Sequence, residues 1–401
     1  MLALAGLITC YWVGTTMIRP LVAPYTAGLG AGGLQVAAVL AAQAVPAAVL
    51  AVPAGLVADR LGHRRLVALG SVVTVVGGLL LAAPGGIPAI VLGQAVIGAG
   101  GVAVWLGVQG WMIARAPGDT DADRDRRMSN WSVVVLVGQL AGPVVGGLLA
   151  DLTGYRGAFF AFAAIALVGV VCARGMAELP RPAPADGEAS VSVRGLLGSY
   201  RTAASLTRSP GMVLTLLVSF CAAGLLDLRT AFQPLYFHTL GLTPTVIGVV
   251  LSCGTAAGVV SRAALVPLLR RCRIGTVAVL TLVPGAAAVG GVAFVEDLWA
   301  VFLLAGVAGL SLGMAQPLTL RLTADVTDPR HHGVAIGLRL VANRTARWLD
   351  PLFFGAVLAV TSLPVALVCT ALLVTGAALV AGRGLNRLPG ADPRPGGPAA
   401  S

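Results

Sequence analysis

The chain lacks lysine and has few charged residues of either sign. All 27 of its basic residues are arginine, and charged residues make up only 11% of its 401 positions. Acidic residues number 16, which leaves a formal net charge of +11. Hydrophobic residues reach 57% and the mean hydropathy is +0.91, values that exclude an ordinary soluble globular protein. Such a composition is typical of a chain that lies mostly within a lipid bilayer.

Cysteine and histidine are also scarce and scattered. The six cysteines stand singly, without a Cys-x-x-Cys pair, and the four histidines show no metal-ligand spacing. We therefore expect no disulfide framework and no metal site. The phosphate-binding loop Gly-x-x-x-x-Gly-Lys-[Ser/Thr] is absent from the sequence, so an ion gradient rather than ATP is expected to supply energy. No nucleophile and base have catalytic spacing, which disfavours an integral-membrane enzyme.

Long apolar runs fill most of the chain. A helix that crosses a bilayer needs about 20 apolar residues, and the sequence predicts an all-α membrane protein with twelve such helices in two bundles of six. The predicted helices cover residues 2–26, 33–57, 65–83, 87–114, 130–150, 156–176, 211–238, 244–268, 274–294, 298–323, 333–358 and 363–384. The predicted domains are an N-terminal bundle (1–176), a cytoplasmic linker (177–210), a C-terminal bundle (211–384) and a disordered cytoplasmic tail (385–401). A second polar connection is expected at 116–129.

Most arginines fall in alternate connections between the predicted helices. This positive-inside pattern places both termini and the loop around Arg60 in the cytoplasm. The net positive charge therefore indicates orientation in a lipid bilayer and not a nucleic-acid partner. Exclusive use of arginine, with abundant Ala, Gly and Val, favours a bacterial source, and thus a bacterial plasma membrane.

The two halves of the chain look like copies. Leu29-Gly30 recurs as Leu240-Gly241, and Gly98 recurs at the same offset as Gly309. Parallel internal repeats are typical of secondary transporters, in which the substrate site lies between the halves near the middle of the membrane.

The connection between the second and third predicted helices combines an acid, glycines and cations. It reads Gly55-Leu-Val-Ala-Asp59-Arg60-Leu-Gly62-His63-Arg64-Arg65. Its glycines permit a tight turn and close helix approach, and an acid is favoured at a helix N-terminus. We interpret it as a device that locks two helices at the membrane surface; the alternative is a topology loop with an incidental acid.

The fifth predicted helix carries a run of small residues, Gly138-Gln-Leu-Ala-Gly142-Pro143-Val-Val-Gly146-Gly147. Proline at position 143 is expected to bend the helix, and the paired glycines are expected to let a neighbouring helix pack tightly. A generic small-residue interface is the alternative.

These two motifs resemble signatures of the major facilitator superfamily. The loop is similar to G-x-L-A-D-R-x-G-R-R-x-R at Gly55, Asp59, Arg60, Gly62, Arg64 and Arg65, with His63 where a cation is usual. The helix resembles the G-x-x-x-G-P-x-x-G-G signature of the drug:proton antiporter branch. The resemblance implies two pseudo-symmetric six-helix bundles that work by alternating access, with Asp59 holding the start of the eleventh helix, near 334–339, in one state.

The sequence departs from the family at two places. Aligned on Gly98, the family's R-x-x-Q-G element of the fourth helix reads Gln94 and Ile97 here, so the usual N-terminal cation linked to proton coupling is missing. In the second copy of the loop, Arg270 stands at the position that corresponds to Asp59. The acid is therefore expected to act as a one-sided latch.

Ionisable residues inside membrane helices are costly, and each is a functional candidate. Asp227 and Arg229 lie two positions apart, which is about 200° around a helix, so we expect one to face the pathway and the other a neighbouring helix. Asp227 and Asp350 are the candidate proton carriers, and a structural ion pair is the alternative for each. Arg347 is close enough to Asp350 along the helix to pair with it.

Cations outnumber these two acids. The arginines in predicted helices are Arg19, Arg229, Arg344 and Arg347. An excess of arginine suits an anionic or carboxylate-bearing substrate.

Four aromatic residues are candidates to stack on a substrate: Trp12, Trp105, Phe232 and Trp348. Helix packing or a membrane-interface belt is the alternative. Aromatics reach only 5% of the chain, which argues against a broad aromatic multidrug pocket.

We expect a monomeric secondary transporter that exports a small organic molecule by proton antiport, without a cofactor. The alternative transport function is uptake or symport of a metabolite anion.

Overall fold

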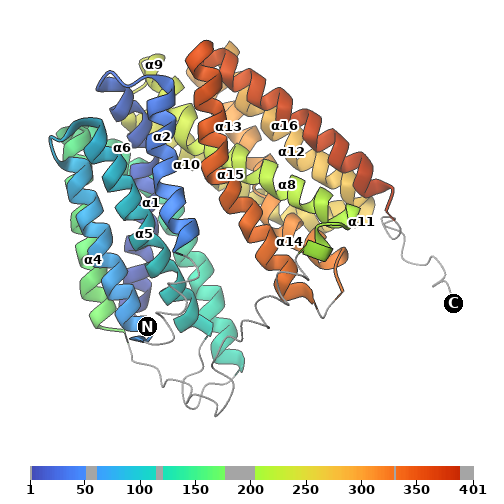
Figure 1. The fold of residues 1–401 in the computed structure, drawn as a ribbon, viewed down its shortest axis with the longest axis horizontal. Coiled ribbons are helices and arrows are strands. Elements are labelled where there is room, and N and C mark those ends of the chain that lie inside the picture. The colour runs from blue at the N-terminus through green and yellow to red at the C-terminus, as the bar shows by residue number, and fades with distance from the viewer. Residues whose placement is uncertain (1, 51–60, 114–120, 177–203, 329–330, 389–401) are drawn as a thin grey trace. The chain divides into compact units, whose positions relative to one another are not determined.

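The computed structural model describes residues 2–50, 61–113, 121–176, 204–328 and 331–388, and each described element is a helix. The α-helices are α1 (Leu2–Gly28), α2 (Gly33–Val49), α4 (His63–Ala82), α5 (Gly86–Ile113), α6 (Asp121–Arg174), α8 (Pro210–Asp227), α9 (Gln233–Thr239), α10 (Pro244–Ser261), α11 (Leu265–Arg271), α12 (Ile274–Gly291), α13 (Leu298–Leu312), α14 (Ala315–Asp325), α15 (His332–Val360) and α16 (Leu363–Asn386) (Figure 1). A π-helix, η1 (Leu228–Phe232), joins α8 to α9, and the 3-10 helices η2 (Arg262–Ala264) and η3 (Val292–Phe294) follow α10 and α12.

Within the described residues, eight helical segments are long and apolar enough to cross a membrane. One of them, Trp131–Arg174, has 44 residues and contains two of the predicted helices. Two further helices, α1 and α15, have 27 and 29 residues and carry more polar side chains. The prediction of an all-α membrane protein is confirmed.

One predicted connection is partly wrong. The polar connection expected at 116–129 is helical from Asp121 onward, because α6 begins there. The segment 121–137 contains neither glycine nor proline, so nothing in it ends the helix. The helical path of α6 is instead interrupted at Gly154, whose φ of 75° favours glycine.

Four predicted helices are composite in the described residues. The seventh consists of α8, η1 and α9, and the tenth consists of α13 and α14. The eighth covers α10, η2 and part of α11, and the ninth covers α12 and η3. A π-helix inserts a wider turn, and such turns are frequent at functional sites because they change which side chains share a face.

The chain forms two compact units. The first comprises Met1–Ala185, Thr230–Ser252 and Pro351–Val360. The second comprises Asp186–Arg229, Cys253–Asp350 and Thr361–Ser401. The first unit thus takes in two segments from the second half of the sequence. One runs from Thr230 in η1 through α9 into α10, and the other is the end of α15.

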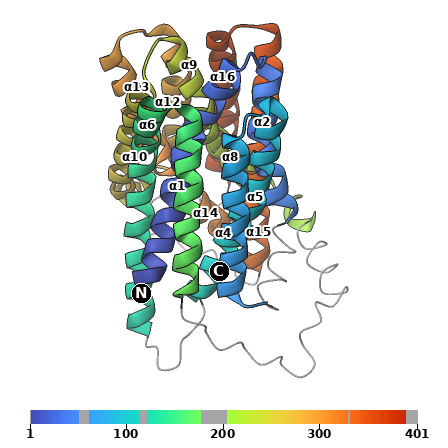
Figure 2. The ribbon, with the colours of Figure 1, turned by 90° about the vertical axis from the view of Figure 1, so that its left-hand side faces the viewer.

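Extensive helix pairing holds the first unit together. α1 packs along α6, and α4 packs along α5 (Figure 2). Met17, Leu81 and Phe159 are fully buried in an apolar cluster of this unit. Close packing of such side chains holds membrane helices together through van der Waals contacts.

Close backbone contacts hold the second unit together. A Cβ atom added to Gly309 on α13 would overlap the carbonyl of Gly254 on α10. Small residues allow membrane helices to approach closely, which strengthens their packing where no water drives association.

Candidate functional site

The glycine motif of α6 faces α1. A Cβ on Gly142 would overlap the Thr16 hydroxyl, and one on Gly146 would overlap the carbonyl of Met17. A Cβ on Gly138 would lie 2.6 Å from Cβ of Trp12. The Thr16 hydroxyl lies 2.7 Å from its own helix at the Trp12 carbonyl and 3.1 Å from the Gly138 carbonyl on α6. Three motif glycines, spaced four residues apart, therefore form one face that holds α1.

The remaining part of the motif faces α10. A Cβ on Gly147 would overlap the carbonyl of Pro244, and a Cβ on Gly248 would overlap the carbonyl of Pro143. The Ser252 hydroxyl donates a hydrogen bond of 2.7 Å to the Leu140 carbonyl. The motif is thus a two-sided interface, with α1 on one side and the first part of α10 on the other. The helix continues through Pro143 with helical dihedral angles.

An acid lies just beyond this contact. The carboxylate of Asp151 accepts a hydrogen bond of 2.9 Å from the backbone N–H of Thr245, at the start of α10. One turn further along, the ring of Tyr155 lies 6.4 Å from the ring of His238 on α9. These contacts all lie within the first unit.

The end of α15 makes a second contact in the same unit. A Cβ on Gly355 would overlap the side chain of Ala37 on α2, and a Cβ on Gly33 would lie 2.7 Å from Leu358. The ring of Phe354 lies 4.2 Å from that of Phe232, which is only 1% exposed. Phe232, predicted as a candidate for stacking on substrate, is therefore packed in the interior in this conformation.

The other aromatic candidates lie in two places. Trp12 and Trp105 meet edge to face at 5.5 Å, and the ring of Trp131 lies 5.7 Å from Trp105. The ring of Tyr11 stacks on Trp105 at 6.3 Å. Trp348 lies half-buried on α15. The sequence did not single out Tyr11 and Trp131, although both belong to the same aromatic cluster.

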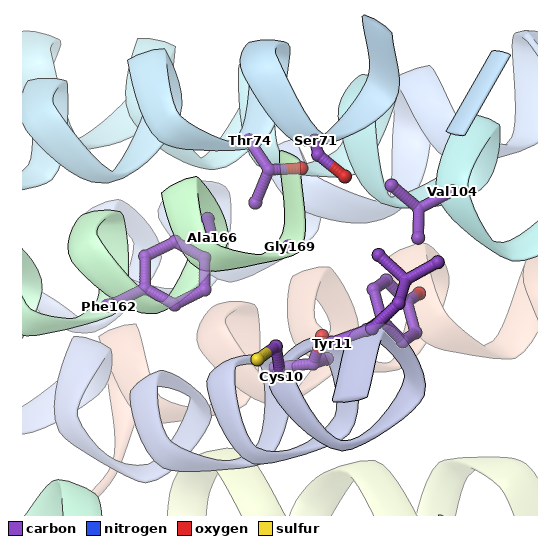
Figure 3. A pocket seen from close by; sticks show the side chains of 10 residues that line it. Cys10, Tyr11, Ser71, Thr74, Val104, Phe162, Ala166 and Gly169 are labelled. Atoms are coloured by element: carbon purple, nitrogen blue, oxygen red, sulfur yellow. The ribbon is translucent and has the colours of Figure 1, made fainter. Parts of the chain in front are cut away.

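A small pocket lies beside this cluster, among α1, α4, α5 and α6. Its lining residues are Leu7, Cys10, Tyr11, Thr15, Ser71, Thr74, Val104, Phe162, Ala166 and Gly169 (Figure 3). The Tyr11 hydroxyl donates to the Gly101 carbonyl at 3.3 Å, and the Thr74 hydroxyl donates to the Gly70 carbonyl at 2.9 Å. Thr74 is thus engaged with its own helix and Tyr11 with α5, and the lining of the pocket is mainly apolar.

Two acids of the second unit lie on α8 and α15. Asp227, the last residue of α8, is 4% exposed. Asp350 on α15 lies against Gly224, where an added Cβ would overlap its carboxylate. The Asp350 carboxylate interacts electrostatically with Asp227, and its Oδ2 is buried without a hydrogen-bond partner among the described residues. Asp350 forms no ion pair with Arg347 in the described part of the chain, so the pairing considered from their spacing is wrong.

Arg229 points in another direction. It is 4% exposed, and a Cβ on Gly254 of α10 would overlap its guanidinium. The same Cβ would also lie against the Ala305 carbonyl of α13. Arg229 therefore packs between α10 and α13, whereas Asp350 lies against Gly224 on α8. That one of Asp227 and Arg229 faces the pathway stays a prediction.

The remaining cations differ in exposure. Arg19 on α1 and Arg344 on α15 are half-buried, and Arg347 is exposed. The sequence missed Arg339, which is 8% exposed on α15. It stands near the start of the predicted eleventh helix, where an arginine indicates the cytoplasmic side of the membrane. Only its burial in the structure separates it from the arginines that mark orientation.

The latch loop is described only in part. Gly55, Asp59 and Arg60 lie outside the described residues. Gly62 precedes α4 with a φ of 84°, a conformation that requires glycine at this turn. Arg64 is half-buried and Arg65 is exposed.

The position of the missing family cation is neutral and buried. Gln94 on α5 is 2% exposed, and its Oε1 has no hydrogen-bond partner within the described ranges. Four residues on, a Cβ at Gly98 would overlap the carbonyl of Gln43 on α2. No group of three or more His, Cys, Asp or Glu side chains that could hold a metal occurs in the described residues.

Comparison with known proteins gives consistent matches. A family model described as Major Facilitator Superfamily matches residues 4–349, with a second match over 228–399. The chain is 20% identical over 346 residues to the quinolone resistance protein NorA of Staphylococcus aureus, covering 86% of each protein. It is 26% identical over 245 residues to the drug efflux pump JefA of Mycobacterium tuberculosis, covering 56% of this chain and 47% of JefA.

Solved structures share the fold at low identity. The crystal structure of the nucleoside transporter NupG matches with a TM-score of 0.77 at 15% identity and covers 96% of this chain and 97% of that one. A bacterial homolog of the human lysosomal transporter Spinster, in an inward-facing and unoccupied conformation, matches with a TM-score of 0.76 at 14% identity, covering 96% of each chain.

Proposed function

The chain belongs to the major facilitator superfamily, and on this premise we propose that it exports a small organic molecule from a bacterial cell in exchange for protons. Membership makes it a multi-pass membrane transporter rather than an enzyme. The names of the relatives that match it, a quinolone resistance protein and a drug efflux pump, support export. In this proposal the protein is a monomer with both termini in the cytoplasm, and a proton gradient takes the place of any cofactor.

The observation that carries proton coupling is the placement of the Asp350 carboxylate against Gly224 on α8, three residues before Asp227. These two acids are the only ones that the sequence places deep within the predicted helices, and they interact across α8 and α15. Two neighbouring carboxylates in an apolar bundle form a group that can bind and release a proton. Asp350 Oδ2, without a hydrogen-bond partner among the described residues, is the atom best placed to carry it.

The N-terminal helices support this assignment indirectly. Gln94 cannot titrate, so it cannot replace the cation that the family uses at that position. Proton exchange in this chain therefore depends on the acids of the second unit.

Alternating access would use the contacts of the first unit as an outer gate. In the proposal, the packing of α6 on α10 and of α2 on α15 closes the outer side. Asp59 holds the cytoplasmic side in the opposite state. The glycines that make the outer contact so close, Gly147 and Gly355, also allow it to separate without disengaging long side chains.

The test is exchange in vesicles. Purified protein is reconstituted in proteoliposomes, a pH gradient is imposed, and flux of a fluorescent quinolone is followed for wild type, Asp227→Asn and Asp350→Asn. We expect gradient-driven flux in wild type and a loss of at least about tenfold in each variant, since neither amide can carry a proton. Glu296→Gln, an exposed acid between η3 and α13, is the matched control.

The outcomes separate the parts of the proposal. Wild-type flux that ignores the pH gradient contradicts proton antiport. Gradient-driven flux that survives both asparagine variants contradicts the choice of carriers. If substrate instead accumulates inside the vesicle only when protons move in the same direction, the result supports the alternative function, symport of a metabolite anion. The excess of arginine favours that function.

A further inference from the structure

Arg339 is a buried cation that the proposed mechanism leaves unused. It lies seven residues after the first residue of α15, which is about 10 Å along the helix axis. Only 8% of it is exposed. The positive-inside pattern puts this end of α15 on the cytoplasmic side, where an exporter first meets its substrate.

The contacts of Arg339 are all neutral. Its Nη1 donates to Gln316 Oε1 at 3.4 Å and to Thr319 Oγ1 at 3.3 Å, both on α14. Its Nε is buried without a hydrogen-bond partner in the described ranges. No described carboxylate forms an ion pair with it, and the acid on the same neighbouring helix, Asp325, pairs instead with Arg321 at 3.3 Å.

This geometry leaves one edge of the guanidinium without a hydrogen bond among the described residues. Both hydrogen bonds leave from Nη1, so they fix the plane of the group without using its Nε–Nη2 edge. That edge presents two parallel N–H groups at the spacing of the two oxygens of a carboxylate. A buried charge without a counter-ion is unfavourable because it has lost its hydration. An incoming anion would reduce this free-energy cost.

The charge balance among the elements α8, η1 and α15 agrees. These elements hold the acids Asp227 and Asp350. The same elements hold the cations Arg229, Arg339, Arg344 and Arg347. Cations exceed acids by two, so a bound molecule that carries a negative charge improves the balance.

We propose that Arg339, oriented by Gln316 and Thr319, binds the carboxylate of the exported molecule as it enters from the cytoplasm. The inference rests on the proposed export function and adds to it a substrate class, small organic carboxylates. The Nε–Nη2 edge holds the carboxylate, and the rest of the molecule extends away from α14.

Equilibrium binding to the full-length purified protein tests the site. The probes are nalidixate and 1-naphthoate, with their ethyl esters as neutral partners, measured in a non-ionic detergent. We expect wild type to bind each acid more tightly than its ester. Arg339→Gln should weaken binding of the acids by about 10- to 100-fold, the range expected when a charge-assisted hydrogen bond is lost, and leave the esters unchanged.

Three further variants sharpen the result. Arg339→Lys keeps the charge without the bidentate edge and should give an intermediate loss. Thr319→Val keeps Arg339 and removes one of its anchors, so it should weaken acid binding even if Arg339→Gln fails to fold. Arg262→Gln removes an exposed arginine at the start of η2 and should have no effect.

Several outcomes would overturn the site. The first is failure of wild type to bind either acid saturably, and the second is equal weakening of acid and ester binding in Arg339→Gln. The third is binding of phosphatidylglycerol alone at Arg339, which would assign the site to a lipid headgroup. If Arg339→Gln reduces transport of the acids and of their neutral esters equally, and by as much as Asp59→Asn does, Arg339 belongs to the latch. Because binding is measured without a gradient, the binding results do not depend on whether export is coupled to protons.

Discussion

Asp151 on α6 caps the N-terminus of α10 through a hydrogen bond of 2.9 Å from the backbone N–H of Thr245 to its carboxylate. The first four N–H groups of a helix have no partner within it, and an acid there is stabilising. In most helices the capping side chain comes from the adjacent sequence. Here it comes from 94 residues away, so the cap also joins two distant segments of the first unit.

Replacing this acid should loosen the start of α10. Asp151→Ala removes the acceptor for Thr245 N–H, a loss of about 0.5–2 kcal/mol for a helix cap. We expect faster hydrogen–deuterium exchange of the amides at 245–248. Thr153→Val is the control, because the Thr153 hydroxyl bonds only to the Leu149 carbonyl of its own helix. Unchanged exchange in Asp151→Ala would show that glycine packing alone holds this contact.

The glycine motif should tolerate added methyl groups unequally. Gly147→Ala places a Cβ against the Pro244 carbonyl, whereas Gly169→Ala in the same helix meets Leu7 at 3.6 Å, an ordinary contact. We expect Gly147→Ala to destabilise the protein by about 1–3 kcal/mol and to reduce transport, and Gly169→Ala to do neither. Thermal unfolding in detergent and vesicle flux measure the two effects. Equal behaviour of both variants would contradict the close α6–α10 contact.

Gly224 should be required for the geometry of the acid pair. A Cβ at this position overlaps the Asp350 carboxylate, so Gly224→Ala should push that group away from Asp227. We expect gradient-driven flux to fall by about tenfold or more while the protein still folds, since the loss of positioning at a reacting group has large effects on rate. Gly376→Ala on α16, which meets open space, is the control.

The aromatic cluster of the first unit should contribute to stability. Trp105 contacts Tyr11, Trp12 and Trp131, and each such aromatic pair adds about 0.5–1.5 kcal/mol beyond burial. We expect Trp105→Leu to lower the thermal unfolding temperature clearly. Trp299→Leu removes a side chain that is 80% exposed and should change it little. If Trp105→Leu instead keeps its stability and loses affinity for transported aromatics, the ring belongs to the substrate site.

Local residue patterns predicted the helical architecture well. Apolar runs, arginine placement and the two motifs indicated the fold because each depends on neighbours in sequence. The errors lie at boundaries such as Asp121, where a polar composition indicated a connection although nothing in it ends a helix. The composite seventh helix could not be foreseen, because a π-helix at 228–232 leaves no distinctive composition.

The sequence by itself determined which residues share a face and which charges enter the membrane. Helical periodicity separates Asp227 from Arg229 and aligns Gly138, Gly142 and Gly146, since about 3.6 residues complete a turn. Periodicity does not say which helix that face meets.

Only the tertiary structure decided those partners. It set the Asp350 carboxylate against Gly224 rather than Arg347, divided the glycine motif between α1 and α10, and left Arg339 with neutral contacts among the described residues. The physical reason is that these contacts join segments remote in sequence. Their distances depend on how the helices pack, and no local pattern encodes that packing.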